Sequence, residues 1–187
     1  INYYGISMDC CPNSVVSCNE VYGTGYSLGQ SSPLLPRGLK VNESQRSKFS
    51  CNYFSNTYIG ASFENGCYSD SIRVNSYHNH HYGLHYDKCC ITGPQHHQGN
   101  LWYGTYIRAA KHEYDSSLVN VFQNVYYVKT VTGYFPSSID PVVWFTLTQD
   151  TATYYCTNCP KPDSIPPSDS SFNSLDYAIA NGLIVGE

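Results

Sequence analysis

Apolar and polar residues alternate along much of this chain, which is the pattern of a β-strand with one buried face. The alternation is clearest in four segments, at 70–77, 101–107, 125–131 and 143–147. Residues 57–63 read as another strand, in which Gly60 indicates a bulge or the close approach of another backbone. Helical periodicity is almost absent before residue 172. The sequence therefore predicts an all-β fold.

Turn signals separate the predicted strands, for example at Pro36-Arg37-Gly38, Asn65-Gly66 and Gly93-Pro94. Short strands divided by such turns are typical of β-sandwiches and β-barrels. We therefore expect a sandwich- or barrel-like arrangement of the strands.

Two segments near the start of the chain return in its second half. The segment from Tyr4 to Cys11 returns, with one insertion, from Tyr82 to Cys90. Tyr22-Gly23-Thr24 likewise returns as Tyr103-Gly104-Thr105. Self-similarity at a nearly constant offset indicates a repeated structural unit, here of about 80 residues. The sequence therefore predicts two diverged β-rich repeats.

A proline-rich segment follows the second repeat. Residues 160–171 contain four prolines, which favour an extended conformation over regular structure. Beyond them lies an apolar tail with a short predicted helix at 173–180, and such a tail can dock on its own domain or on another copy. The predicted organisation is a first β repeat (1–81), a second β repeat (82–159), a linker (160–171) and a C-terminal tail (172–187).

The charge of the chain excludes one class of partner. Only 13% of the residues are charged, the net charge is −4, and the basic residues are scattered. Nucleic-acid binding requires clustered lysine and arginine, so no nucleic-acid partner is expected. No stretch approaches the roughly 20 apolar residues of a membrane-spanning helix, so no membrane span is expected either.

Nine cysteines in 187 residues indicate an oxidising compartment. The chain begins at Ile1, as expected of a secreted protein after signal removal or of a fragment, and Asn42-Glu43-Ser44 is a glycosylation sequon. We therefore expect a secreted, extracellular, disulfide-stabilised glycoprotein. The odd count leaves one cysteine over, and the sequence does not define the pairing among Cys10, Cys11, Cys18, Cys51, Cys67, Cys89, Cys90, Cys156 and Cys159.

The C-x-x-C motif from Cys156 to Cys159 has three interpretations. It predicts structural disulfides in an extracellular chain, whereas zinc binding and redox chemistry are the alternatives. Structural disulfides are the expectation, because seven other cysteines compete for pairing.

The chain has 19 tyrosines, and aromatic residues beside glycine recur in both repeats. Exposed aromatic rings beside polar groups can bind sugars, whereas buried rings form cross-strand pairs, and both interpretations stay open. The candidate ligand-binding residues are Tyr22, Tyr26, Trp102, Tyr103 and Tyr106.

Six of the seven histidines fall between residues 78 and 97. Alternation in a strand would place His78 and His80 on the same face. Several imidazoles that converge could bind copper or zinc, although a hydrated loop without metal is the alternative. The candidate metal ligands are His78, His80, His85, His96 and His97.

No catalytic motif such as G-x-S-x-G, H-E-x-x-H or a glycine-rich phosphate loop occurs. The leading hypothesis is a secreted non-enzymatic protein without a cofactor, with an adhesive, matrix or carbohydrate-binding role. Its partner would be a glycan or another extracellular protein, and residues 172–187 would mediate self-assembly. The alternative is a histidine-cluster protein or metalloenzyme that binds copper or zinc.

Overall fold

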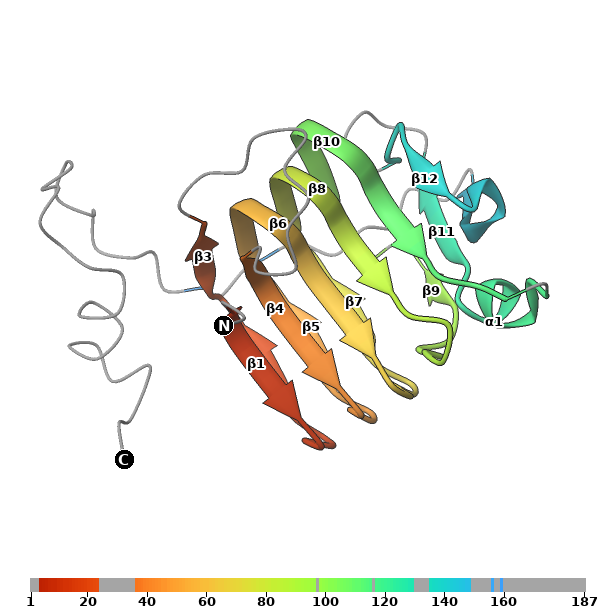
Figure 1. Cartoon of the computed structure of the whole chain (residues 1–187), viewed down its shortest axis with the longest axis horizontal. Helices are drawn as coiled ribbons and strands as arrows, with labels where there is room; N and C mark the ends of the chain where they lie inside the picture. The colour runs from red at the N-terminus through yellow and green to blue at the C-terminus, as the bar shows by residue number, and fades with distance from the viewer. Residues whose placement is uncertain are drawn as a thin grey trace, which may run out of the picture.

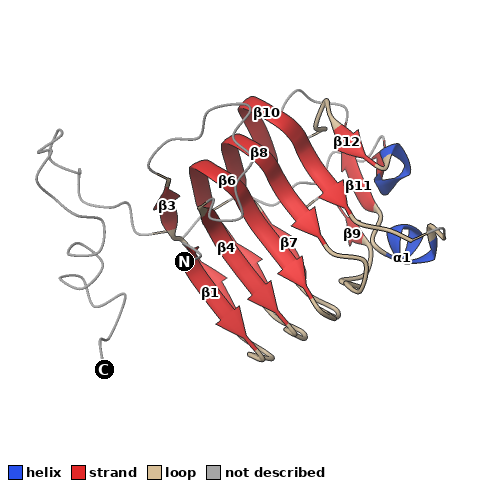
Figure 2. Ribbon diagram, in the orientation of Figure 1, coloured by secondary structure: helices blue, strands red, loops and turns tan. Residues whose placement is uncertain are grey.

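The computed structural model describes residues 4–23, 36–96, 98–115, 117–129 and 135–148, together with Cys156 and Cys159. These residues are dominated by strands, with one short α-helix and one 3-10 helix, so the predicted strand-rich fold is confirmed (Figure 2). The predicted linker and tail lie outside the described residues. No described helix is long and apolar enough to cross a membrane.

The chain contains long strands separated by one or two short ones in its first half. The first eight are β1 (Tyr4–Asp9), β2 (Val15–Ser17), β3 (Glu20–Tyr22), β4 (Arg37–Asn42), β5 (Lys48–Ser50), β6 (Tyr53–Glu64), β7 (Ser71–Arg73) and β8 (Ser76–Tyr86). The remaining elements are β9 (Gln95–His96), β10 (Leu101–His112), α1 (Val119–Gln123), β11 (Tyr126–Lys129), β12 (Ile139–Asp140), η1 (Val142–Trp144) and β13 (Phe145–Thr148).

Every strand pairing in the described residues is parallel. A seven-stranded sheet runs in the order β1-β4-β6-β8-β10-β12, with β3 beside β6, and two three-stranded sheets are β2-β5-β7 and β13-β11-β9. Figure 1 shows the long strands side by side, in chain order from the N-terminal end to the end that carries α1. The structure does not confirm a sandwich or barrel, whose strands are mostly antiparallel.

Equivalent residues of neighbouring long strands lie one turn of the chain apart. Val41 pairs with Phe63, 22 residues later, and Phe63 pairs with Tyr86, 23 residues later. The chain therefore winds as a parallel β-solenoid, and we call each turn a coil. Side chains that point inward from successive coils form rows in the core.

The two copies of the tyrosine–glycine motif occupy the same position in different coils of the seven-stranded sheet. Tyr4 pairs with Arg37, Arg37 with Ile59, and Ile59 with Tyr82. The motif therefore recurs after three coils, and Arg37-Gly38 and Ile59-Gly60 occupy the same place in the coils between. The predicted boundary at 81/82 falls within β8, and the sheet continues across it.

An inward row of aromatic rings fills the core beneath β6, β8 and β10. Phe54 stacks on Tyr77 with ring centroids 5.7 Å apart, and Tyr77 stacks on Trp102 at 5.5 Å. These rings lie against glycines. A Cβ on Gly60 would lie 2.5 Å from the Gly83 carbonyl oxygen and 2.7 Å from the Tyr77 ring, which confirms the predicted close approach at Gly60.

A row of buried asparagines supports the corner between the short and long strands. The Asn75 side-chain oxygen accepts hydrogen bonds from the Asn52 backbone N–H at 3.0 Å and from its amide at 2.9 Å. The Asn100 side-chain oxygen likewise accepts hydrogen bonds from the Asn75 backbone N–H at 2.9 Å and from the Asn75 side-chain amide at 3.2 Å. Each amide thus satisfies backbone N–H groups that the sheets leave unpaired at the corner.

The glycosylation sequon lies at the end of a strand. Asn42 is the last residue of β4, and its side chain is hydrogen-bonded to Asp9 and Asn65. Ser44 is buried and its hydroxyl donates to Ser47 at 2.8 Å. Glycosylation of Asn42 stays a prediction.

Candidate functional site

Strands β3, β6, β8 and β10 carry an outward row of side chains on the opposite face from the aromatic core row. Tyr22, Ser55, His78 and Tyr103 occupy equivalent positions in four successive coils. Their neighbours in sequence point inward, because side chains alternate along a strand. We define the tyrosine patch as this row together with the residues beside it: Glu20, Tyr22, Tyr53, Ser55, His78 and Tyr103.

At the β3 end of the tyrosine patch, two tyrosines lie beside a carboxylate. Tyr22 is 54% exposed, and its ring centroid lies 5.5 Å from that of Tyr53. The Tyr22 hydroxyl donates a hydrogen bond of 2.9 Å to Glu20. Partial burial and this contact with Glu20 raise the pKa of Tyr22 to about 12. Tyr22 therefore keeps its proton at neutral pH.

His78 lies in the middle of the tyrosine patch. Its Nδ1 atom lies 3.1 Å from the Ser55 hydroxyl and 3.4 Å from the Tyr53 hydroxyl. Its imidazole stacks on the ring of Tyr103 with centroids 4.8 Å apart. Tyr103 is 41% exposed, and partial burial and the Tyr53 hydroxyl raise its pKa to about 12. The tyrosine patch thus combines ring faces with hydroxyl groups held as neutral donors and acceptors.

The structure separates the five predicted ligand-binding residues. Tyr22 and Tyr103 lie together in the tyrosine patch. Trp102 is only 3% exposed and stacks in the core, so it has no face available to a ligand. Tyr106 is half-buried against the core, and its hydroxyl lies 2.9 Å from that of Ser137. Tyr26 lies outside the described residues.

The candidate metal ligands do not converge among the described residues. His78 points outward, whereas His80 is fully buried with Nδ1 3.0 Å from the Thr57 hydroxyl, and burial lowers its pKa to about 4. The predicted shared face fails because Asn79 between them has a φ of +55°, which bends the strand. His85 contacts Glu113 at 3.3 Å on the outer face of the sheet.

The last two candidate ligands lie elsewhere. His96 is exposed and stacks on Tyr127 at 4.4 Å, and His97 falls outside the described residues. A metal site built on these histidines stays a prediction, and the positions of the described histidines do not support it.

The C-x-x-C motif forms two disulfides with cysteines of the first coils, as expected of a structural role. Cys159 is bonded to Cys18, with Cα atoms 5.2 Å apart, and Cys156 to Cys51, with Cα atoms 5.7 Å apart. Within the described ranges, Cys51, Cys156 and Cys159 are the group close enough to share a metal ion, with sulfur atoms within 4.8 Å of one another. Each of these sulfur atoms is already in a disulfide, and zinc binds thiolates.

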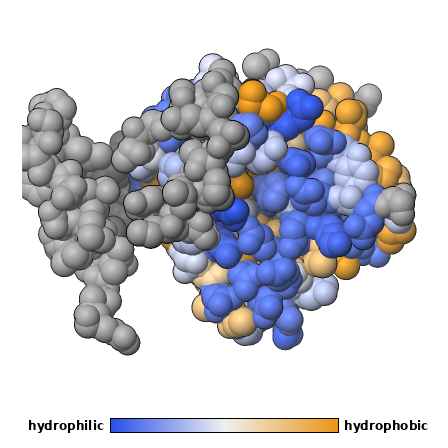
Figure 3. Space-filling view, in the orientation of Figure 1, coloured by the Kyte–Doolittle hydropathy of each residue, from blue (hydrophilic) through white to orange (hydrophobic). Residues whose placement is uncertain are grey.

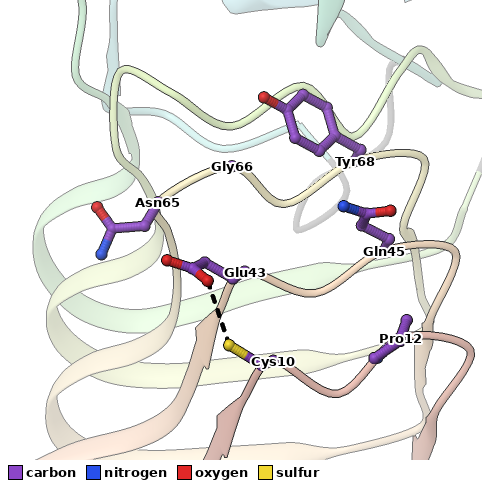
Figure 4. Close-up of a pocket in the computed structure, with 7 residues that line it drawn as sticks. All are labelled: Cys10, Pro12, Glu43, Gln45, Asn65, Gly66 and Tyr68. Carbon is purple, nitrogen blue, oxygen red and sulfur yellow. Dashed lines mark hydrogen bonds between the residues drawn. The ribbon is translucent and has the colours of Figure 1, made fainter.

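A hollow of about 410 Å³ lies at the turns that follow β1, β4 and β6. Figure 4 shows the Glu43 carboxylate directed at the sulfur of Cys10, with the ring of Tyr68 across the hollow. The Cys10 thiol donates a hydrogen bond of 3.2 Å to Glu43, and this contact raises its pKa to about 11. Because the thiolate is the nucleophile, this geometry does not suit catalysis by Cys10.

Replacing Glu43 with glutamine is expected to make Cys10 more reactive. Removal of the carboxylate returns the thiol pKa toward its ordinary value of about 8.5, so alkylation at pH 8 accelerates more than tenfold. Peptide-level mass spectrometry of iodoacetamide labelling measures the rate, and the exposed thiol of Cys89 in the same molecule is the control. An equal acceleration at Cys89, or none at Cys10, contradicts the role of Glu43.

The outer face carried by β1, β4 and the second halves of β6, β8 and β10 is charged. Glu64 pairs with Arg37 and Lys40, and Glu113 pairs with Lys111 at 2.6 Å. Figure 3 shows a largely hydrophilic face, with hydrophobic residues gathered toward the end that carries α1 and β12. Since these carboxylates are neutralised by neighbouring cations, they do not form a free acid–base pair.

Sequence reasoning missed Glu20, Tyr53 and Ser55. Glu20 lies two residues before Tyr22 on β3, where the alternation of side chains could have placed it on the same face. Tyr53 and Ser55 lie on β6, and only the coil register could have identified them. Comparisons of the chain with protein-family models, curated proteins and solved structures give no match. The functional interpretation therefore depends on the chemistry of the tyrosine patch.

Proposed function

We propose that this protein is a secreted, non-enzymatic carbohydrate-binding protein, and that it holds a glycan against the tyrosine patch. The observation that carries the proposal is the pair of half-exposed rings of Tyr22 and Tyr103, in one row with Ser55 and His78. A sugar has apolar C–H faces, which pack on aromatic rings, and hydroxyl groups, which need hydrogen-bond partners.

The polar groups of the tyrosine patch meet the second requirement. The Tyr22 hydroxyl donates its proton to Glu20, so its oxygen and the free oxygen of Glu20 can accept hydrogen bonds from a sugar, and the Tyr103 hydroxyl also stays protonated at neutral pH. A neutral glycan suits this patch better than an anionic one, because the Glu20 carboxylate beside Tyr22 would repel an anion.

The length of the row favours an oligosaccharide over a single sugar. Tyr22 and Tyr103 are three strand spacings apart in register, which is about 14 Å. This is the spacing of their backbones, and the Tyr53 ring lies between Tyr22 and Tyr103, so a chain of several sugars can follow the row from one ring to the other.

Two observations support the rest of the proposal. The two disulfides are consistent with an oxidising, extracellular compartment. The absence of a catalytic role is supported by the protonated thiol of Cys10 and by the neutralised carboxylates of Glu64 and Glu113.

A glycan array tests this function. The wild-type protein is expected to bind neutral oligosaccharides, and the Tyr22→Ala/Tyr103→Ala double variant to lose most of the signal, at least tenfold, because two stacking faces of about 1 kcal/mol each disappear. Tyr114→Ala is the matched control, since Tyr114 is 47% exposed and lies outside the tyrosine patch. Equal signals from the double variant and the wild type would contradict the proposal.

We also propose that residues 172–187 mediate self-assembly, in keeping with an adhesive or matrix role. In the described residues β1, β2 and β3 each have a neighbour on one side only, and unpaired strand edges can pair with another chain. Cys159 is bonded to Cys18 of the first coil, so the sequence that follows begins beside these edges.

Deletion of residues 166–187 is expected to reduce the mass of the protein in solution to that of a monomer. The deletion removes the apolar tail and leaves both disulfides intact, so loss of assembly can be assigned to the tail. Light scattering at several concentrations measures the mass, with the full-length chain as reference. An unchanged oligomeric state would exclude this role of the tail.

A further inference from the structure

Two cysteines outside the disulfides lie next to each other in the core. Cys67 and Cys90 are both 0% exposed. They precede Tyr68 and Ile91, which pair with each other, and the Ile91 N–H donates a hydrogen bond of 2.8 Å to the Cys67 carbonyl. Their backbones are therefore one strand spacing apart, which is about 4.8 Å.

This spacing suits a disulfide. Bridged cysteines have Cα atoms roughly 4.4–6.8 Å apart, and their side chains must point toward each other. Both thiols point into the same row of the core, and they are in contact. The hydrogen bond between them lowers the pKa of Cys67 and raises that of Cys90.

The remaining thiols of the described residues are unsuitable partners for this pair. Ser44 lies between Cys11 and Cys67: its carbonyl accepts a hydrogen bond of 2.9 Å from the Tyr68 N–H, and its hydroxyl contacts the Cys11 carbonyl at 3.4 Å. Cys11 is therefore two strand spacings from Cys67, about 10 Å, which exceeds the reach of a disulfide. Cys10 and Cys89 are exposed and point away from the core.

We propose that Cys67 and Cys90 form a third disulfide, which joins the coil that contains β6 to the coil that contains β8. The two thiols lose two protons and two electrons as the S–S bond forms. A disulfide-bearing oxidant, such as oxidised glutathione or a protein disulfide donor, accepts the electrons and becomes two thiols. The exchange takes place during folding, before the coils bury both sulfur atoms.

This bond defines the connectivity that the sequence left open. The disulfides are Cys18–Cys159, Cys51–Cys156 and Cys67–Cys90, and the remaining thiols are those of Cys10, Cys11 and Cys89. All three lie at the turns that follow the long strands, so the free thiols occur along one edge of the solenoid.

Thiol counting on the full chain tests the proposal. Protein produced with export into an oxidising compartment is unfolded without reductant, alkylated with iodoacetamide and weighed intact. Three alkylated cysteines are expected, and five would overturn the proposal, because the structure shows five cysteines outside its two disulfides. Digestion with trypsin and a glutamate-specific protease then separates Cys67 from Cys51, by cleavage after Glu64. The cross-linked peptide is expected to contain Cys67 and the Cys89-Cys90 pair.

Two variants identify the second cysteine of the bond. Cys89→Ser is expected to retain the cross-linked peptide, whereas Cys90→Ala loses it and leaves Cys67 open to alkylation. Retention of the link in Cys90→Ala, or a link from Cys67 to Cys11, would overturn the assignment. The wild-type thiol count decides the matter even if the Cys90→Ala protein folds poorly.

Discussion

Replacement of Asn75 with alanine is expected to lower the free energy of unfolding by about 4 kcal/mol. Asn75 is buried, and its side chain accepts two hydrogen bonds from Asn52 and donates to the Phe49 carbonyl at 2.9 Å and to Asn100. Alanine leaves several of these buried groups without a partner, and each costs about 1–3 kcal/mol. Urea unfolding followed by circular dichroism measures the change.

Asn19→Ala is the matched control for this prediction. Asn19 lies at the end of the same asparagine row, where its side chain donates to Ser17 and Asn52 near solvent. Water can replace these hydrogen bonds, so we expect Asn19→Ala to lower the free energy of unfolding by about 1 kcal/mol. If both variants lower the free energy of unfolding equally, the buried hydrogen bonds of Asn75 do not stabilise the protein more than the solvent-exposed ones of Asn19.

Replacement of Trp102 with alanine is expected to destabilise the protein by about 4 kcal/mol, without removing a ligand contact. Trp102 stacks on Tyr77 at 5.5 Å and packs edge-on against Phe145 at 5.6 Å. Removal of a buried indole leaves a cavity between two coils, and such changes cost about 3–5 kcal/mol. The midpoint of urea unfolding is the measurement.

Trp102→Phe separates the structural role from a binding role. Phenylalanine keeps a ring in the aromatic core row, so the loss of stability is expected to be less than half of that in the alanine variant. Glycan binding by the folded Trp102→Phe protein is expected to equal that of the wild type. Selective loss of binding in this variant would restore Trp102 as a ligand contact.

The sequence predicted strands correctly but not their direction. Alternation defines which side chains are buried, whereas parallel and antiparallel neighbours produce the same alternation. The tyrosine–glycine repeat was visible only between the first and fourth coils. In the coils between, Arg37 and Ile59 replace the tyrosine, so the shorter period of one coil was hidden.

The candidate site was predicted in part for a related reason. Tyr22 and Tyr103 were identified because their tripeptides are similar, and the register places them in one row. Tyr53 has no such sequence signal, since its place beside Tyr22 depends on the coil length. His80 was misplaced because the positive φ at Asn79 interrupts the alternation between His78 and His80. Trp102 was misplaced because both it and its neighbour Tyr103 were taken as candidates, although adjacent residues of a strand point to opposite faces.

We propose that the tyrosine patch binds a glycan through its exposed rings. Titration calorimetry with the strongest oligosaccharide from the array tests it most directly, on the wild type, Tyr103→Ala, Tyr103→Phe and Tyr114→Ala. We expect Tyr103→Ala to weaken binding about fivefold, Tyr103→Phe to retain most of it through the ring face, and Tyr114→Ala to match the wild type. Unchanged affinity in Tyr103→Ala, or an equal loss in Tyr114→Ala, would contradict the account.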